Sequence, residues 1–160
     1  MYHSYFKGDS VVKPTNEWKH TNPKDAVGIK KPRYYSAIPM NVVREVGIAF
    51  LEGGMKYGRH NFRVAGVRAD VYYDACIGHL ADWWEGQDID PDSGLHHITK
   101  AIACLFVIRD AQLNGLDNDN RPPHTNVDKS KEAMQKIVDS LFEKYPEPEP
   151  PYIKGDTKLR

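Results

Sequence analysis

The chain has 160 residues, among them 22 lysines plus arginines and 22 aspartates plus glutamates, so its formal net charge at pH 7 is zero. This length is typical of one domain, and the balanced charge excludes a strongly basic protein that coats nucleic acid. Two cysteines are too few for a disulfide scaffold, and no apolar run has the length of a membrane span or a signal peptide. We therefore expect a cytoplasmic protein with no membrane or nucleic-acid partner.

The N-terminal part of the chain predicts an irregular arm followed by a helix. Residues 1–37 contain scattered prolines and glycines, and their apolar residues show no sustained period. Pro39 is suited to a first helical turn, and it opens a helix that we expect to end at Gly58. A loop is expected over residues 59–68.

Two further helices are predicted around an acidic loop. Residues 70–86 carry an apolar stripe at helical spacing. The stripe consists of Tyr73, Ile77, Leu80 and Trp84. After the loop at 87–94, Ser93 is expected to cap the most apolar helix, which ends near Asn114 and should be the central one.

The C-terminal part predicts a fourth helix and an extended tail. Residues 117–127 form a polar loop, and 128–144 are amphipathic. Residues 146–160 are proline-rich and should be extended. With no internal repeat and no alternating strand pattern, the chain predicts an all-α bundle of about four helices, a single domain over 1–145 with its arm at 1–37 and its tail at 146–160.

Potential metal ligands gather in the second helix, the acidic loop and the start of the third helix. His79, Asp82 and Glu85 follow one another at helical spacing, and His97 lies one turn into the next helix. The loop adds Asp88, Asp90 and Asp92. Such an oxygen-rich set with one or two imidazoles suits Mg²⁺ or Mn²⁺. Alternatively, the carboxylates are a solvated loop and His97 is a hydrogen-bonded core histidine.

One argument favours a bound cation in this loop. The eight residues 85–92 hold four carboxylates and no lysine or arginine. Their repulsion is unfavourable unless the loop is well solvated or binds a cation.

The first helix carries Glu45, Glu52 and Lys56 on one face, at spacings of seven and eleven. The two glutamates could face the acidic loop and complete a metal site. The alternative is a surface stripe in which Glu52 and Lys56 contribute only a few tenths of a kcal/mol.

A basic segment precedes the helices. Four cations within residues 22–33, namely Lys24, Lys30, Lys31 and Arg33, face only Asp25, which leaves a local charge of +3. A loop glycine between lysines can bring N–H groups and ammonium groups to a phosphate. A flexible basic arm is the alternative.

Three blocks of sequence resemble a known family. They read NPKDAVGIKKPR, GGMKYGRHNF and GHLADWWEGQDIDPDSGLHHITKAIACL, and they come in family order between Asn22 and Asn114. The chain resembles the phage dATP/dGTP diphosphohydrolases, which are small all-α, MazG-like nucleotide pyrophosphohydrolases, and within them the MazZ type.

The resemblance implies hydrolysis of a purine deoxynucleoside triphosphate, with dGTP favoured over dATP, to the monophosphate and pyrophosphate. It further implies two or more Mg²⁺ or Mn²⁺ ions, a homodimer or homotetramer, and remodelling of a phage dNTP pool in the host cytoplasm. The chain departs from the MazG pattern because His79 and Asp82 replace glutamates of the first motif, and His97 and Lys100 fall at acidic positions of the second.

These arguments together give the expected site residues. Glu45 or Asp82 should orient the attacking water, and Lys56 should stabilise charge on the leaving group. The expected metal ligands are His79, Asp82, Glu85, Asp90, Asp92 and His97. The expected substrate contacts are Asn22, Lys24, Lys30, Lys31, Tyr57, Asn61 and Lys100, of which Asn22, Lys24 and Asn61 rest on the resemblance alone.

Two other functions are known for small helical proteins. A helical triphosphohydrolase of the HD type needs a His-Asp dipeptide, and the sequence contains none. A non-enzymatic helical phage protein could instead bind a host factor through Trp83, Trp84 and the proline-rich tail.

Overall fold

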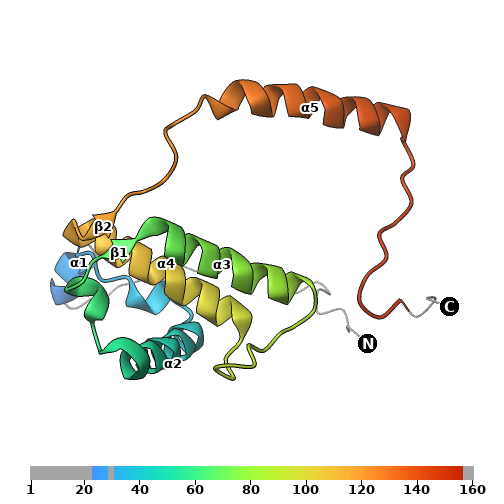
Figure 1. Cartoon of the computed structure of the whole chain (residues 1–160). Helices are drawn as coiled ribbons and strands as arrows, with labels where there is room; N and C mark the ends of the chain where they lie inside the picture. Colours follow the sequence, from blue (N-terminus) through green and yellow to red (C-terminus); the bar gives the residue numbers. More distant parts are fainter. Residues whose placement is uncertain (1–22, 29–30, 157–160) are drawn as a thin grey trace.

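A computed structural model of the chain describes residues 23–28 and 31–156, and within them the fold is helical (Figure 1). Four long helices are α2 (Met40–Tyr57), α3 (Ala69–Trp84), α4 (His97–Asn114) and α5 (Val127–Lys144). The shorter elements are α1 (Pro23–Gly28) and two 3₁₀ turns, η1 (Tyr35–Ala37) and η2 (Asn61–Arg63). The predicted all-α architecture is confirmed, and Gly58 and Gly115 end their helices as expected.

A small parallel sheet was not expected from the sequence. Strand β1 (Val67–Arg68) pairs with β2 (Asp117–Asn118), with Val67 opposite Asp117. Each strand has two residues, which are too few to show the alternation that identifies a strand in a sequence. The pair ties the start of α3 to the segment that follows α4.

Helix α4 is the central element, as predicted. It contacts α2, α3, η2 and both strands. Its buried side chains include Ala101, Val107 and Ala111, and Val107 and Ala111 form a core cluster with Val67. Phe50, Phe62 and Tyr72 pack around this cluster.

Helix α3 buries a different face from its apolar stripe. Cys76 is buried, and His79, three residues further on, bonds with His97 of α4. The predicted stripe lies outward instead, with exposed fractions from 37% for Leu80 to 78% for Trp84. The helical spacing of apolar residues identifies an apolar face of a helix. It does not say whether other residues of the same chain cover that face.

The expected cap at Ser93 is wrong, because α4 begins four residues later. The His96 side chain caps it by accepting a hydrogen bond from the Ile98 N–H at 3.2 Å. The Ser93 hydroxyl instead donates to Asp90 Oδ2 at 2.6 Å and accepts from the Leu95 N–H. Ser93 is therefore used to close the acidic loop.

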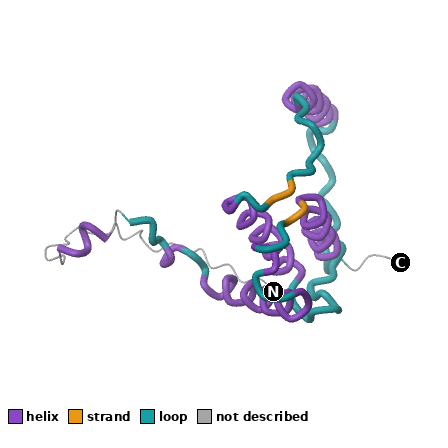
Figure 2. The backbone as a smooth tube through the Cα atoms, turned by 60° about the vertical axis from the view of Figure 1, so that its left-hand side comes forward, coloured by secondary structure: helices purple, strands orange, loops and turns teal. Residues whose placement is uncertain are grey.

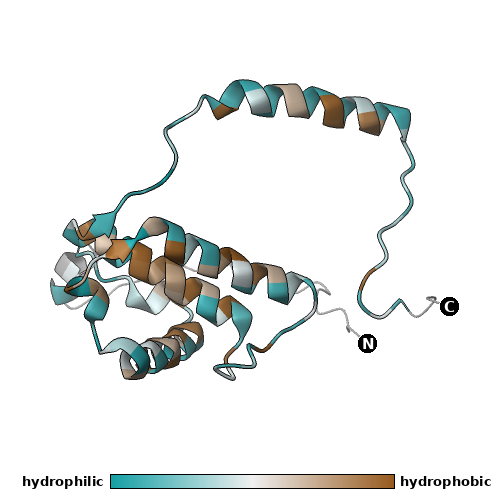
Figure 3. Ribbon diagram, viewed as in Figure 1, coloured by the Kyte–Doolittle hydropathy of each residue, from teal (hydrophilic) through white to brown (hydrophobic). Residues whose placement is uncertain are grey.

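The remaining segments stand apart from the packed helices. Helix α5 lies above α3 without packing on it, and all its residues are exposed (Figure 1). Hydrophobic and hydrophilic residues alternate along it, so it has the amphipathic character that the sequence predicts (Figure 3). Residues 146–156 contain no helix or strand, and α1 and η1 extend away from the other helices (Figure 2). Within the described ranges, no helix has the length and apolarity that a membrane crossing requires.

Gly66 allows the close approach of the two strands, and its replacement by alanine is expected to destabilise the fold. Its φ is +77°, and an added Cβ would lie 3.0 Å from the Leu116 carbonyl oxygen. We expect Gly66→Ala to lower the free energy of unfolding by about 1–3 kcal/mol in urea titrations. Gly78→Ala is the control, because this helical position has open space and alanine gains up to about 1 kcal/mol there. Equal stability of the two variants would contradict the strand geometry.

Candidate active site

Three carboxylates and two ammonium groups alternate where the C-terminal half of α2 meets the acidic loop and α4. We call Glu52, Lys56, Asp90, Asp92 and Lys100 the carboxylate–lysine cluster. Lys56 Nζ lies 2.7 Å from Glu52 Oε1 and 2.7 Å from Asp92 Oδ2. Lys100 bonds to the other oxygen of Glu52, and its Nζ is 4.0 Å from Asp90 Oδ2. The predicted approach of Glu52 to the acidic loop is therefore present.

Local structure fixes the members of this cluster. Glu52 and Lys56 are one turn apart on α2, with the carboxylate on the N-terminal side, which is the favourable order. The loop closes through the Asp90 N–H to the Leu95 carbonyl at 2.8 Å and the His97 N–H to the Asp88 carbonyl at 3.0 Å. Asp90 is thereby held buried at the base of the loop.

The cluster favours the charged forms of Glu52 and Asp90. Burial acts to raise the pKa of Glu52, but the bonds to Lys100 and Lys56 outweigh it and lower that pKa. Burial likewise acts to raise the pKa of Asp90. The Ser93 hydroxyl, the Asp92 N–H and the charge of Lys100 outweigh burial and lower that pKa. The hydrogen bonds to Asp92 and Glu52 raise the pKa of Lys56. With three anions against two cations, the cluster has an excess negative charge that can receive a cation.

A histidine pair lies beside the cluster. His79 Nδ1 and His97 Nδ1 are 2.9 Å apart, so one ring donates a hydrogen bond to the other. His97 is 2% exposed, and its Nε2 has no hydrogen-bond partner among the described residues. Burial lowers the pKa of His79. An unpartnered buried ring nitrogen is available to a water molecule or a ligand.

Glu45 lies two turns before Glu52 on α2. Its Oε2 accepts a hydrogen bond from the buried Thr99 hydroxyl at 2.8 Å. Thr99 directly precedes Lys100 in the chain. The partner of Glu45 and the lysine of the cluster are therefore neighbouring residues of α4. Among the described residues, Glu45 forms no ion pair with Lys56 or Lys100.

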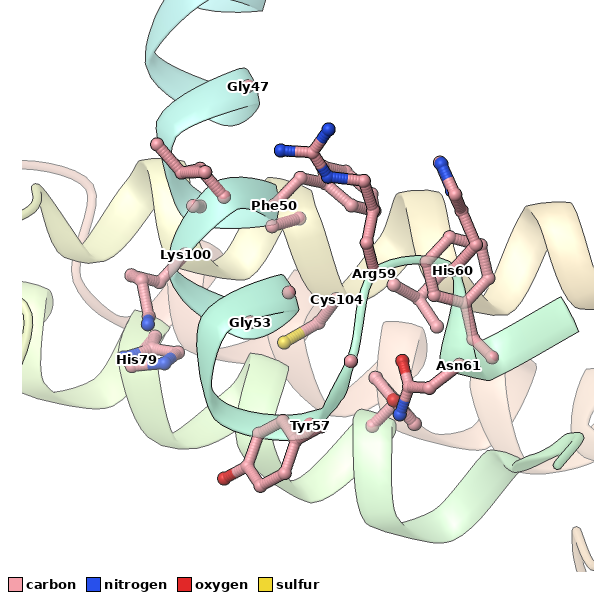
Figure 4. Close-up of a pocket in the computed structure, with 18 residues that line it drawn as sticks. Gly47, Phe50, Gly53, Tyr57, Arg59, His60, Asn61, His79, Lys100 and Cys104 are labelled. Carbon is pink, nitrogen blue, oxygen red and sulfur yellow. The ribbon is translucent and has the colours of Figure 1, made fainter. Parts of the chain in front are cut away.

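A pocket of about 480 Å³ adjoins the cluster, and Lys100 belongs to both. Phe50, Tyr57, Phe62 and Tyr72 contribute aromatic rings to its wall. Figure 4 shows Lys100 and His79 together at one side of the pocket, with Asn61 on the other. Its volume lies within the range of about 300–1,000 Å³ that is usual for small-molecule sites.

The structure brings together only part of the predicted set. Tyr57, Asn61 and Lys100 line the aromatic pocket, and Lys56, Asp90 and Asp92 belong to the cluster. Asp82 and Glu85 are exposed at the C-terminal end of α3. Lys24 and Lys31 lie on the arm that extends away from the helices, while Asn22 and Lys30 lie outside the described residues.

Of the aromatic wall of the pocket, sequence reasoning identified Tyr57 and missed Phe50, Phe62 and Tyr72. Phe50 and Phe62 stack edge to face at 5.9 Å between ring centroids, although the chain between them turns back at Gly58. The signal available in the sequence was their placement on either side of the GGMKYGRHN segment. Thr99, the partner of Glu45, carried no such signal.

The donor chemistry of the cluster suits a hard divalent cation. Lys100 places a positive charge between the Glu52 and Asp90 carboxylates, and carboxylate oxygens are the preferred ligands of Mg²⁺ and Mn²⁺. In this arrangement, however, no three His, Cys, Asp or Glu side chains of the described residues form a group that could hold a metal ion. Glu52, Asp90 and Asp92 therefore fit the ion in chemistry, with lysines occupying the space between them.

A comparison with protein families identifies the family to which this chain belongs. The family model for the dATP/dGTP diphosphohydrolase, N-terminal, matches residues 21–121, which include the pocket and the cluster. The chain belongs to the dATP/dGTP diphosphohydrolase family. It is accordingly a hydrolase that acts on nucleoside triphosphates, and the non-enzymatic alternative is set aside. Helix α5 and the tail lie beyond the matched region.

Two other comparisons were negative: no curated protein and no solved structure matches the chain. The residue roles in this diphosphohydrolase must therefore be argued from its own geometry.

Proposed function

We propose that the enzyme hydrolyses a purine deoxynucleoside triphosphate, with dGTP favoured and dATP possible, to the monophosphate and pyrophosphate. The observation that carries this proposal is the shared position of Lys100, at the side of an aromatic pocket and inside a cluster of carboxylates and lysines. A nucleotide has the same two parts, an aromatic base and a charged polyphosphate. The family membership supports the nucleotide, and the resemblance to the MazZ type favours guanine.

The proposal includes two or more Mg²⁺ or Mn²⁺ ions. Glu52, Asp90 and Asp92 are the residues that would hold them, with His97 as a further donor through its unpartnered nitrogen. When bound, such ions neutralise the triphosphate and lower the pKa of a coordinated water.

The side chains of the enzyme supply binding, orientation and proton transfer. Lys56 and Lys100 pair with the phosphate oxygens and stabilise the charge that develops on the leaving pyrophosphate. Glu45 or Asp82 orients the water, whose oxygen attacks the α-phosphorus while the bond from that phosphorus to the α,β-bridging oxygen breaks. The proton of the water passes to the orienting carboxylate.

A homodimer or homotetramer is part of the proposal. The outward stripe of α3 and the apolar side of α5 remain exposed in the single chain. Exposed apolar faces are typical of protein interfaces, and symmetric association of copies is the commonest arrangement. In the host cytoplasm, such an enzyme would remodel the dNTP pool during phage replication.

A product assay tests the proposed reaction. The full chain is incubated with each of the four dNTPs and Mn²⁺, and the products are separated by chromatography. We expect dGMP and pyrophosphate to appear fastest from dGTP, and a chelator to stop the reaction. Formation of dGDP and phosphate, or of deoxyguanosine and tripolyphosphate, would contradict the assignment.

A further inference from the structure

Gly53 lies in the interior of α2, where a glycine destabilises the helix by about 0.5–1 kcal/mol relative to alanine. Its φ is not positive, so backbone conformation does not require a glycine there. A Cβ built on Gly53 meets no atom within 4 Å, so close packing does not require it either. The neighbouring Gly54 differs, because its Cβ would contact Arg59 at 3.5 Å.

The open space beside Gly53 belongs to the aromatic pocket, since Gly53 is one of the residues that line it. Figure 4 shows Gly53 on α2 with Cys104 of α4 beside it. Any side chain at position 53 would therefore occupy volume that the protein leaves empty.

The polar side chain on the far side of the pocket is Asn61. Asn61 is half-buried, and its side-chain amide makes no hydrogen bond with another described residue. An amide offers a donor and an acceptor side by side, which matches the edge of a purine. Aromatic rings provide stacking surfaces for any nucleobase.

We propose that this pocket holds the purine base of the nucleotide, that Gly53 leaves the space which the base ring occupies, and that Asn61 reads its edge. This proposal rests on the proposed function, because it assigns the base to the site whose polyphosphate end is the carboxylate–lysine cluster. The phosphates then lie toward Lys100 and His79, on the side of the pocket away from Asn61.

Kinetics of Gly53→Val and Gly78→Ala test the proposal. Valine at position 53 projects into the pocket, so the KM for dGTP should rise at least about ten-fold, the discrimination typical of a small steric change in a binding pocket. Inhibition by inorganic tripolyphosphate should stay unchanged, because tripolyphosphate has no base. Gly78→Ala, which lies outside the pocket, should leave both values unchanged. An unchanged KM in a folded Gly53→Val variant would overturn the base assignment.

A second measurement uses the unmodified protein and does not depend on turnover. Cys104 lines the pocket, whereas Cys76 is buried and does not line it. Because burial raises the pKa of the Cys104 thiol, the protein is labelled with N-ethylmaleimide at alkaline pH and the site is identified by mass spectrometry. Deoxyguanosine and dGTP should slow labelling of Cys104, and tripolyphosphate should not.

The outcomes separate the two proposals. Equal protection by tripolyphosphate and dGTP, or none by either, overturns the base pocket even if the enzyme releases pyrophosphate. Protection by deoxyguanosine in a protein that releases no pyrophosphate from any dNTP supports the pocket and contradicts the proposed reaction. If Gly53→Val does not fold, the labelling result decides.

Discussion

Replacing Lys100 by methionine should lower kcat for dGTP by about 10²–10³-fold, the usual effect of removing one preorganised donor from a site of developing charge. Lys100 is 18% exposed and is held by Glu52, so its ammonium group is already positioned at the side of the pocket. Methionine keeps the length and the apolar stem of lysine but removes the charge. The measurement is steady-state kinetics with dGTP, and the effect should fall on kcat more than on KM.

The same helix offers a matched control. Arg109 of α4 is exposed, bonds with Gln112 and lies outside the pocket, so Arg109→Met removes one cation without touching the site. Its kcat should match that of the parent protein. A Lys100→Met protein with parental kcat would show that Lys100 takes no part in the reaction.

Replacing Ala111 by leucine should lower the free energy of unfolding by about 1–3 kcal/mol, the usual effect of overpacking a filled core. Ala111 is 0% exposed and lies against Val67 and Val107, and its carbonyl accepts the Leu116 N–H at 2.9 Å. The extra carbons have no room unless α4 moves from β1, which would strain the contact between the strands. Urea titration followed by circular dichroism measures the change.

Ala75→Leu in α3 provides the comparison, because Ala75 is exposed and helical. Its stability should stay within about 0.5 kcal/mol of the parent value. If Ala111→Leu were equally neutral, the packing between α4 and the strand pair would be looser than described here.

The sequence predicts the long helices well because their signals are local. Gly58 and Gly115 mark helix ends at the residues observed, and the apolar run of α4 marks the central helix. The strand pair depends on a partner far along the chain. The cap of α4 depends on competition for hydrogen bonds within the loop. Ser93 has the chemistry of a cap, yet Asp90 takes its hydroxyl.

The candidate site shows the same division. The approach of Glu52 to the acidic loop follows from helical spacing, and the loop supplies Asp90 and Asp92 as expected. Spacing also adds Asp82 and Glu85 to this set, and both side chains are exposed at the end of α3. The aromatic pocket depends on how α2 turns back at Gly58 onto α4, and no local pattern records that packing.

The short strand pair described above determines which parts of the site can move. Residues 67–68 and 117–118 bracket α3, the acidic loop and α4, and their pairing holds the two ends of that hairpin together. Sliding or rotation of α4 against α3 would break these hydrogen bonds and separate His79 from His97. The hairpin should therefore behave as one rigid body. Adjustment of the pocket to an incoming nucleotide then falls to α2 and to the 58–62 turn, which are joined to the hairpin through side chains.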